Sequence, residues 1–114
     1  MAKVLGVHEI ELSADGDPAE FERLAAAAMA EPLPDGMSTR LFKADRGRRN
    51  GKYLMVIQLD SVEARDTIFP VEDEDGGEAL AFFETHPATA EAWNRFRDYE
   101  PHTDVATDYV EIGT

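Results

Sequence analysis

Apolar and polar residues recur along this chain in patterns that predict its strands and helices. The clearest of these segments is KYLMVIQLDSVEARDTIF, residues 52–69. Residues 53–59 are almost continuously apolar, so both faces of the strand that they predict need to be covered. Asp60 or Ser61 can then cap a helix, and Glu63 is placed to complete a capping box with Asp60. The segment predicts a central strand that leads directly into a helix.

The rest of the chain contains six more segments with a regular pattern. Residues 3–12 alternate between apolar and polar positions, which predicts a strand that is half buried. Residues 18–29 follow the capping residue Asp17 and carry an apolar stripe with helical spacing, which predicts a helix that ends before Pro32. The remaining predicted elements are strands over 37–44 and 105–112, a helix over 78–84, and a helix that Pro87 begins and Pro101 ends.

The order of these elements predicts one α+β domain over residues 1–114. It is the ferredoxin-like βαββαβ order with an extra helix before the last strand, and its four strands form an antiparallel sheet. The strands at 3–12 and 53–59 are expected at its centre. Because helices cover only one face of such a sheet, the apolar residues on the second face of 53–59 need another cover. We therefore predict a homodimer through the sheet faces, a dimeric α+β barrel.

The charge and composition of the chain exclude several classes of function. Its 24 acidic and 11 basic residues give a net charge of −13, which repels nucleic acids and anionic membranes. No cysteine is present, which excludes disulfides, thiolate metal ligands and cysteine nucleophiles. No segment has the length of a membrane span or the apolar core of a signal peptide. We expect a soluble cytoplasmic protein without nucleic-acid or membrane partners.

Two clusters of charged residues are interpreted as surface features. One is a turn of four basic residues, Arg46, Arg48, Arg49 and Lys52. It either holds an anionic substrate group or forms a hairpin tip that pairs with the acidic run at 72–75. That run lacks the ligand order of calcium loops, and the histidines show no metal-site spacing. Phosphate-binding glycine loops and dinucleotide fingerprints are also absent, so we predict no metal and no cofactor.

Three short features of the chain carry a resemblance to a known group of proteins. They are the strand-to-helix passage LDSVEARDTIF, the tripeptide His86-Pro87-Ala88, and Asp108-Tyr109 in the last predicted strand. With these features the chain resembles the dimeric α+β barrel superfamily, and within it the stress-responsive A/B-barrel domain proteins most closely. The resemblance runs over most of the chain. It implies two ferredoxin-like sheets that close against each other, with a pocket between sheet and helices in each protomer.

The same resemblance implies positions for residues of that pocket. Members with cyclase activity carry histidines around it, one of them just past a His-Pro-x step, and Thr89 stands at that position here. The position of a second family histidine, on the central strand, is occupied by Tyr53. A third family position falls near Gly6, and His8 lies one step further along the same strand face.

Four residues are candidates for chemistry in such a pocket. His8 either acts as a general acid or base or is a hydrogen-bonded histidine at the edge of the core. Tyr53 and Tyr109 lie on strands that we expect to be close, where their hydroxyls either orient a substrate oxygen or only accompany packed rings. Trp93 has the helical spacing of a core residue and is otherwise a pocket wall.

Two functions fit these observations. In the first, each protomer of a homodimer holds a cavity for an apolar or aromatic metabolite and acts as a cofactor-independent oxygenase, cyclase or isomerase. His8 and Tyr53 would be its catalytic residues, and Thr89, Trp93 and Tyr109 would contact the ligand. In the second, the chain is a non-enzymatic module that dimerises or sequesters a ligand. A cavity beside His8 distinguishes them, because a metabolite needs roughly 300 Å³ or more.

Overall fold

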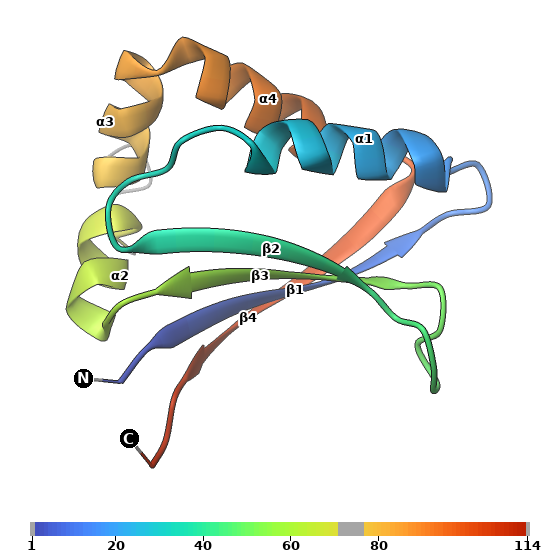
Figure 1. Ribbon diagram of the computed structural model, residues 1–114, viewed down its shortest axis with the longest axis horizontal. Coiled ribbons are helices and arrows are strands. Elements are labelled where there is room, and N and C mark those ends of the chain that lie inside the picture. Colours follow the sequence, from blue (N-terminus) through green and yellow to red (C-terminus); the bar gives the residue numbers. More distant parts are fainter. Residues whose placement is uncertain (1, 71–76, 114) are drawn as a thin grey trace.

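The computed structural model describes residues 2–70 and 77–113, and it has the predicted ferredoxin-like α+β architecture (Figure 1). Its four strands form one antiparallel sheet in the order β2-β3-β1-β4, so the two strands predicted to be central are central. The elements are β1 (Val4–Leu12), α1 (Pro18–Met29), β2 (Met37–Lys43), β3 (Tyr53–Leu59), α2 (Val62–Ile68), α3 (Glu78–Thr85), α4 (Pro87–Arg97) and β4 (His102–Val110). The predicted extra helix before the last strand is present.

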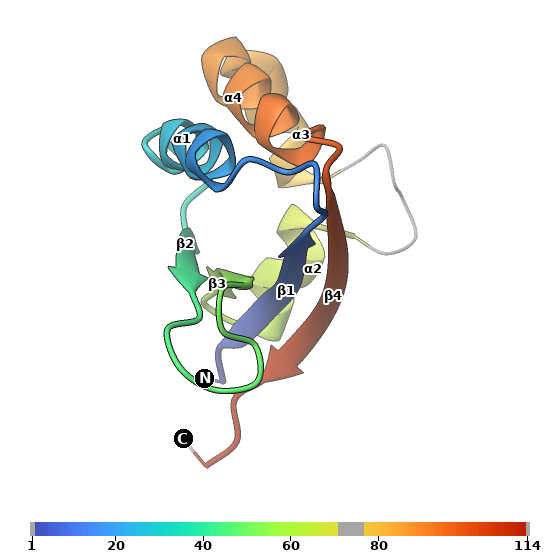
Figure 2. The ribbon, with the colours of Figure 1, turned by 90° about the vertical axis from the view of Figure 1, so that its right-hand side faces the viewer.

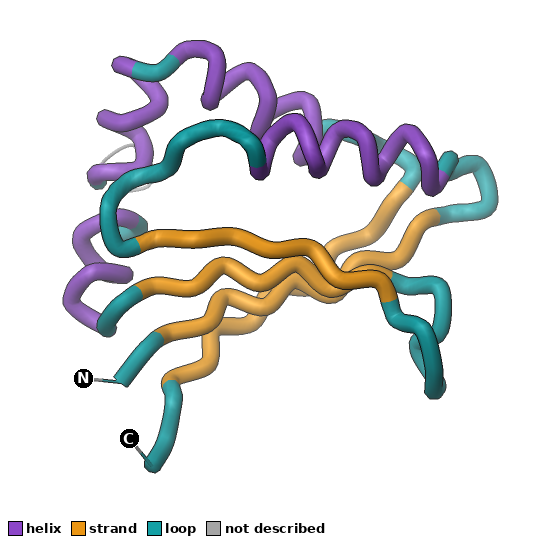
Figure 3. Tube along the Cα trace, viewed as in Figure 1, coloured by secondary structure: helices purple, strands orange, loops and turns teal. Residues whose placement is uncertain are grey.

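The helices form a single layer on one face of the sheet. Helices α1 and α4 pack against each other above the strands, and α2 and α3 lie at one end of the sheet (Figures 1 and 2). We call the face away from α1 and α4 the outer face; among the described residues, no helix covers it (Figure 3). The pair Val7 and Val56 lies near its centre. Phe42, Val105 and Tyr109 are each about half exposed on it.

Short side chains cap α1 and α2 where the sequence places them, with one difference. The Asp17 carboxylate accepts a hydrogen bond from the Ala19 amide at 3.0 Å, at the start of α1. At the start of α2 the cap is Ser61, whose hydroxyl accepts from the Ala64 amide at 3.0 Å. Because the capping box is counted from the cap residue, Glu63 stands one position too early to close it. The predicted box with Asp60 is therefore wrong, although the predicted helix is present.

The last strand begins earlier than its alternation predicts. Strand β4 starts at His102 instead of 105 and ends at Val110 instead of 112. It pairs with β1 along the whole length of that strand, from His102 opposite Leu12 to Val110 opposite Val4. The central strand therefore sets the limits of β4, since each residue of β1 offers backbone groups to a partner.

The basic turn closes the hairpin between β2 and β3. Gly51 has a positive φ of 87°, as the predicted Asn-Gly turn requires. Two of the turn's cations reach back to β1: Arg49 lies 3.6 Å from Glu9, and Lys52 lies 3.4 Å from Glu11. The acidic run at 72–75, which was predicted to pair with this turn, lies outside the described residues.

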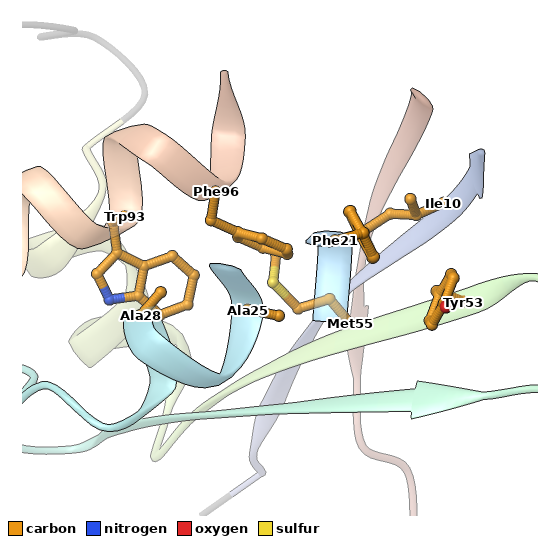
Figure 4. Packing of buried hydrophobic residues seen from close by; sticks show 8 residues of the cluster. All are labelled: Ile10, Phe21, Ala25, Ala28, Tyr53, Met55, Trp93 and Phe96. Carbon is orange, nitrogen blue, oxygen red and sulfur yellow. The ribbon is translucent and has the colours of Figure 1, made fainter. Parts of the chain in front are cut away.

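The core lies between the sheet and the two long helices (Figure 4). Phe21 of α1 is its centre: the ring is fully buried and lies 4.8 Å from the ring of Tyr53 and 5.2 Å from that of Phe96, between centroids. Trp93 continues this aromatic layer, with its ring 5.8 Å from that of Phe96. Trp93 and Phe96 of this core also line the cavity that is described below.

Candidate functional site

A cavity of about 520 Å³ lies between the sheet and the helices, beside the aromatic core. This volume is within the range of small-molecule sites. Its wall is mainly apolar, built chiefly from Ile10, Met55, Ile57, Leu59, Phe83, Trp93 and Phe96. Its polar side chains are His8, Arg65, Arg97, His102, Asp104 and Asp108. None of the four basic residues of the hairpin turn contributes to the wall.

His8 of β1 is the predicted catalytic residue that the structure places on this cavity. Its Nδ1 lies 3.0 Å and 3.1 Å from the two carboxylate oxygens of Asp104, on the neighbouring strand β4. A carboxylate at Nδ1 favours the neutral tautomer in which Nδ1 carries the proton and Nε2 is free to accept one. Within the described part of the chain, Nε2 has no hydrogen-bond partner. The arrangement suits a general base whose orientation is fixed by a carboxylate.

A second ion pair lies further along the same wall. Arg65 of α2 donates to Asp108 of β4 at 2.8 Å and to Asp66 at 2.7 Å. The hydrogen bonds to Asp66 and Asp108 raise the pKa of Arg65. Gly6 lies opposite Asp108 in the sheet, and a Cβ atom on Gly6 would be 3.3 Å from the Asp108 carboxylate. The missing side chain of Gly6 thus leaves part of the cavity open.

The cavity connects the buried core with the edge of the sheet. On its inner side Met55 and Trp93 are 5% and 6% exposed. Where the cavity opens along the edge strand β4, the side chains of Asp104 and Asp108 are 36% and 52% exposed. A ligand can therefore enter along β4 and place an apolar body against the core.

Tyr53 does not line the cavity. Its ring is buried in the core, and its hydroxyl donates a hydrogen bond to Glu22 of α1 at 2.5 Å. Burial and the hydrogen bond to Glu22 raise the pKa of Tyr53, so the phenol stays protonated. The structure therefore gives Tyr53 a packing and helix-docking role and does not bring it to His8.

Tyr109 and Thr89 also lie away from the cavity. Tyr109 pairs with Leu5 in the sheet and so projects from the outer face, whereas His8 projects toward the helices. Only strand β1 lies between β4 and β3, so the strands of Tyr109 and Tyr53 are close, but the two side chains project from opposite faces of the sheet. Thr89 is 1% exposed and donates to the Pro32 carbonyl at 3.4 Å. Of the predicted ligand contacts, Trp93 alone lines the cavity.

The sequence reasoning missed five polar residues of the wall. They are Arg65, Arg97, His102, Asp104 and Asp108. Asp104 and Asp108 share one face of β4, which is a visible signal in the alternation of the strand. The alternation alone does not show that these acids line the cavity. The pairing of β4 with β1 shows it, because it puts both acids on the same face of the sheet as His8.

The bond between Tyr53 and Glu22 has a testable pH dependence. The hydrogen bond from Tyr53 lowers the pKa of Glu22, so the bond stabilises the fold above the usual carboxyl pKa of 4.5 and is lost in acid. We expect Tyr53→Phe to cost about 1 kcal/mol or less at pH 7, because solvent screens the half-exposed Glu22. The cost should shrink as the pH falls well below 4.5. Urea unfolding at both pH values measures it.

Tyr99→Phe is the matched control for this experiment. The Tyr99 hydroxyl accepts a hydrogen bond from the Asp17 backbone amide at 2.8 Å, and this amide does not titrate. The cost of Tyr99→Phe should be the same at both pH values. An equal cost of Tyr53→Phe at both pH values would show that Glu22 does not carry the effect.

The described ranges, 2–70 and 77–113, contain neither a metal-binding cluster nor a membrane-spanning helix. Within them, no group of three or more His, Cys, Asp or Glu side chains lies close enough to hold a metal ion. Within the same ranges, no helix is long and apolar enough to cross a membrane. The acidic run at 72–75 falls outside them.

Comparison of the sequence with other proteins gives no relative. No protein-family model matches it, and no curated protein matches it. The comparison of structures does give similar proteins, and three of them illustrate the range of functions that they cover.

SnoaB from Streptomyces nogalater, a cofactor-independent oxygenase solved as a point mutant, has a TM-score of 0.55 and is 18% identical. The alignment covers 98% of this chain and 95% of the SnoaB chain. A dimeric ferredoxin-like protein of unknown function from Thermobifida fusca has a TM-score of 0.58 and is 12% identical, with coverage of 96% and 92%. Hydroxynitrile lyase from Passiflora edulis has a TM-score of 0.55 and is 16% identical, with coverage of 98% and 95%. At these identities the likeness concerns the fold alone, and the chain has the ferredoxin-like fold.

Proposed function

We propose that this chain is a homodimeric protein that binds an apolar or aromatic metabolite in its cavity and acts on it without a cofactor, with His8 as the general base. The observation that carries the proposal is the position of His8, which lines a cavity of about 520 Å³ while Asp104 holds its Nδ1. The reaction classes are those of a cofactor-independent oxygenase, cyclase or isomerase. All of them can begin with removal of a proton from a carbon atom of the substrate.

The geometry of the pair supports this first step. Nε2 of His8 takes the proton, and the electron pair of the broken C–H bond stays on the substrate. Asp104 stabilises the imidazolium that forms, because its carboxylate lies 3.0 Å from Nδ1. The imidazolium can return the proton at another atom, which gives an isomer. Attack of the carbanion on a carbonyl carbon gives a ring, and its reaction with dioxygen gives an oxidised product.

The similar structures support an enzymatic role. SnoaB is a cofactor-independent oxygenase, and the protein from Passiflora edulis is a hydroxynitrile lyase. Both are enzymes by these descriptions. The fold of this chain is therefore one on which such chemistry occurs, and the choice between the reaction classes rests on the site.

Dimerisation through the outer face is part of the proposal. This face carries apolar side chains from all four strands, and Val105 is 60% exposed there. Two of the similar structures are described as dimeric ferredoxin-like proteins. The closer resemblance to stress-responsive A/B-barrel domain proteins belongs to the same proposal, because it implies the same closure of two sheets.

The test uses 5-nitrobenzisoxazole, a flat aromatic compound that reacts with a base in one step. The base removes the ring C–H proton, the N–O bond breaks, and a coloured nitrophenolate forms. We expect the protein to accelerate this reaction, and His8→Gln to lower kcat/KM about a hundredfold, since general bases contribute 10²–10⁴. Asp104→Asn should lower it less, because it removes only the group that orients His8.

His86→Gln is the control, since His86 bonds the Phe82 carbonyl and is not part of the cavity wall. It should keep the wild-type rate. An unchanged rate in His8→Gln would contradict the role of His8.

Ligand sequestration is the second candidate function. It is favoured by the predominantly apolar wall of the cavity and by the pairing of His8 with Asp104, which gives the Nδ1 atom of His8 a structural partner without a substrate. A ligand that raises the melting temperature, combined with no proton abstraction from 5-nitrobenzisoxazole, would favour this candidate over the enzyme.

A further inference from the structure

Arg97, at the end of α4, is a cation on the wall of the cavity. Its guanidinium donates a hydrogen bond to the side-chain oxygen of Asn94, which is a neutral group. Among the described residues, no carboxylate forms an ion pair with it. A guanidinium keeps its positive charge at neutral pH, so this part of the wall presents a cation to whatever the cavity contains.

The other charged side chains of the wall already have charged or polar partners. Arg65 donates to two carboxylates, that of Asp108 at 2.8 Å and that of Asp66 at 2.7 Å, so its positive charge is balanced. The Asp104 carboxylate lies 3.0 Å from Nδ1 of His8. An anionic group of a ligand would therefore be attracted to the end of α4 and not to the Arg65 end of the wall.

The position of Arg97 on its helix relates it to the aromatic part of the wall. It stands four residues after Trp93, so the two side chains lie on the same side of α4, one turn apart. Trp93 and Phe96 project from α4 toward the sheet (Figure 4), and both line the cavity together with Arg97. A group bound by Arg97 therefore holds the ring to which it is attached against these two aromatic side chains.

We propose that the ligand is an aromatic carboxylate, whose acidic group pairs with Arg97 and whose ring lies against Trp93 and Phe96. A guanidinium matches a planar carboxylate with two parallel N–H···O bonds. The ligand carries one negative charge and not two, since Asp104 and Asp108 on the same wall repel a dianion such as a phosphate monoester. The inference rests on the proposed function, because it concerns the ligand of the same cavity.

The test compares 2-naphthoate with 2-naphthamide, which share a ring system and nearly the same shape but differ by one negative charge. Calorimetric titration at neutral pH should show that the wild-type protein binds 2-naphthoate about tenfold more tightly, because Arg97 is exposed and solvent screens part of the attraction. Arg97→Gln should remove this preference. Arg95→Gln is the matched control: it removes the same charge from the same helix turn, but Arg95 pairs with Glu91 and is not part of the cavity wall. It should keep the preference.

The outcomes separate this inference from the proposed function. Equal affinity of the wild type for both compounds, or a preference that survives in Arg97→Gln, overturns the inference alone. A preference that Arg95→Gln reduces just as much comes from the overall charge, and it overturns the inference as well. Binding of neither compound overturns the proposed function with it.

Trp93 is the single tryptophan of the chain and reports where the compounds bind. Its indole NMR signals should shift with both compounds, because each places a ring against it. Tighter binding of 2-naphthoate that leaves these signals unchanged would take place outside the cavity and would overturn the inference.

Discussion

Val7→Glu is expected to convert a dimer of this chain into monomers. Val7 lies on the central strand β1, and its neighbours across the outer face are Val56 and Thr107, which offer no positive charge. A twofold interface brings the same patch of both protomers together, so one substitution introduces two like charges. An unpaired buried charge costs about 3–5 kcal/mol, and we expect the dissociation constant to rise roughly a thousandfold.

Sedimentation over a range of protein concentrations measures this effect. Ala27→Glu adds the same charge at an exposed position of α1, on the helical side of the sheet, and should leave the dimer intact. A dimer that persists in Val7→Glu would mean that the protomers associate through another surface. A wild-type protein that stays monomeric at every concentration would contradict dimerisation itself.

Phe21→Ala is expected to lower the free energy of unfolding by about 3–5 kcal/mol. Phe21 is fully buried, and its ring contacts those of Tyr53, Phe96 and His102. Removing it leaves a void between α1 and the sheet that these rigid rings cannot fill. The melting temperature should fall by about 10 °C or more.

Leu80→Ala removes an apolar side chain that is 39% exposed on α3, and it should cost about 1 kcal/mol or less. Urea unfolding of both variants provides the comparison. Similar losses in the two variants would show that the aromatic layer around Phe21 is not the centre of stability.

The fold could be predicted from local signals because each of them acts within a few residues. The Asp17 cap, the proline that follows it and the Asn50-Gly51 turn fix where elements begin and end, and the structure confirms these three. The capping choice between Asp60 and Ser61 could not be made in advance. Either side chain reaches the same turn, and only the path of the backbone decides which one meets the Ala64 amide.

Which side chains of β4 face the helices could not be predicted from the residues of that strand. Asp104 and Asp108 alternate with Val105 and Tyr109, and an isolated strand would be expected to bury the apolar set. The structure turns the acidic set toward the helices, where the open edge of the cavity leaves these carboxylates accessible to water and His8 and Arg65 pair with them. The apolar set lies on the outer face instead.

The site was therefore predictable only in part. His8 was identified because its own strand has a clear apolar face, and Trp93 because helical spacing put it on the inner side of α4. Asp104 and His102 enter the site through pairing between strands at opposite ends of the sequence. No pattern within one segment contains that information.

The glycine at position 6 affects both the stability of the chain and the volume of its cavity. Glycine in a strand interior costs about 0.5–1 kcal/mol relative to alanine. A larger apolar side chain at Gly6 would project beside Ile57 and Asp108 and occupy part of the cavity. Under the proposed function, a side chain in that space would remove ligand binding whatever it did to stability, so a search for more stable variants should leave this position unchanged.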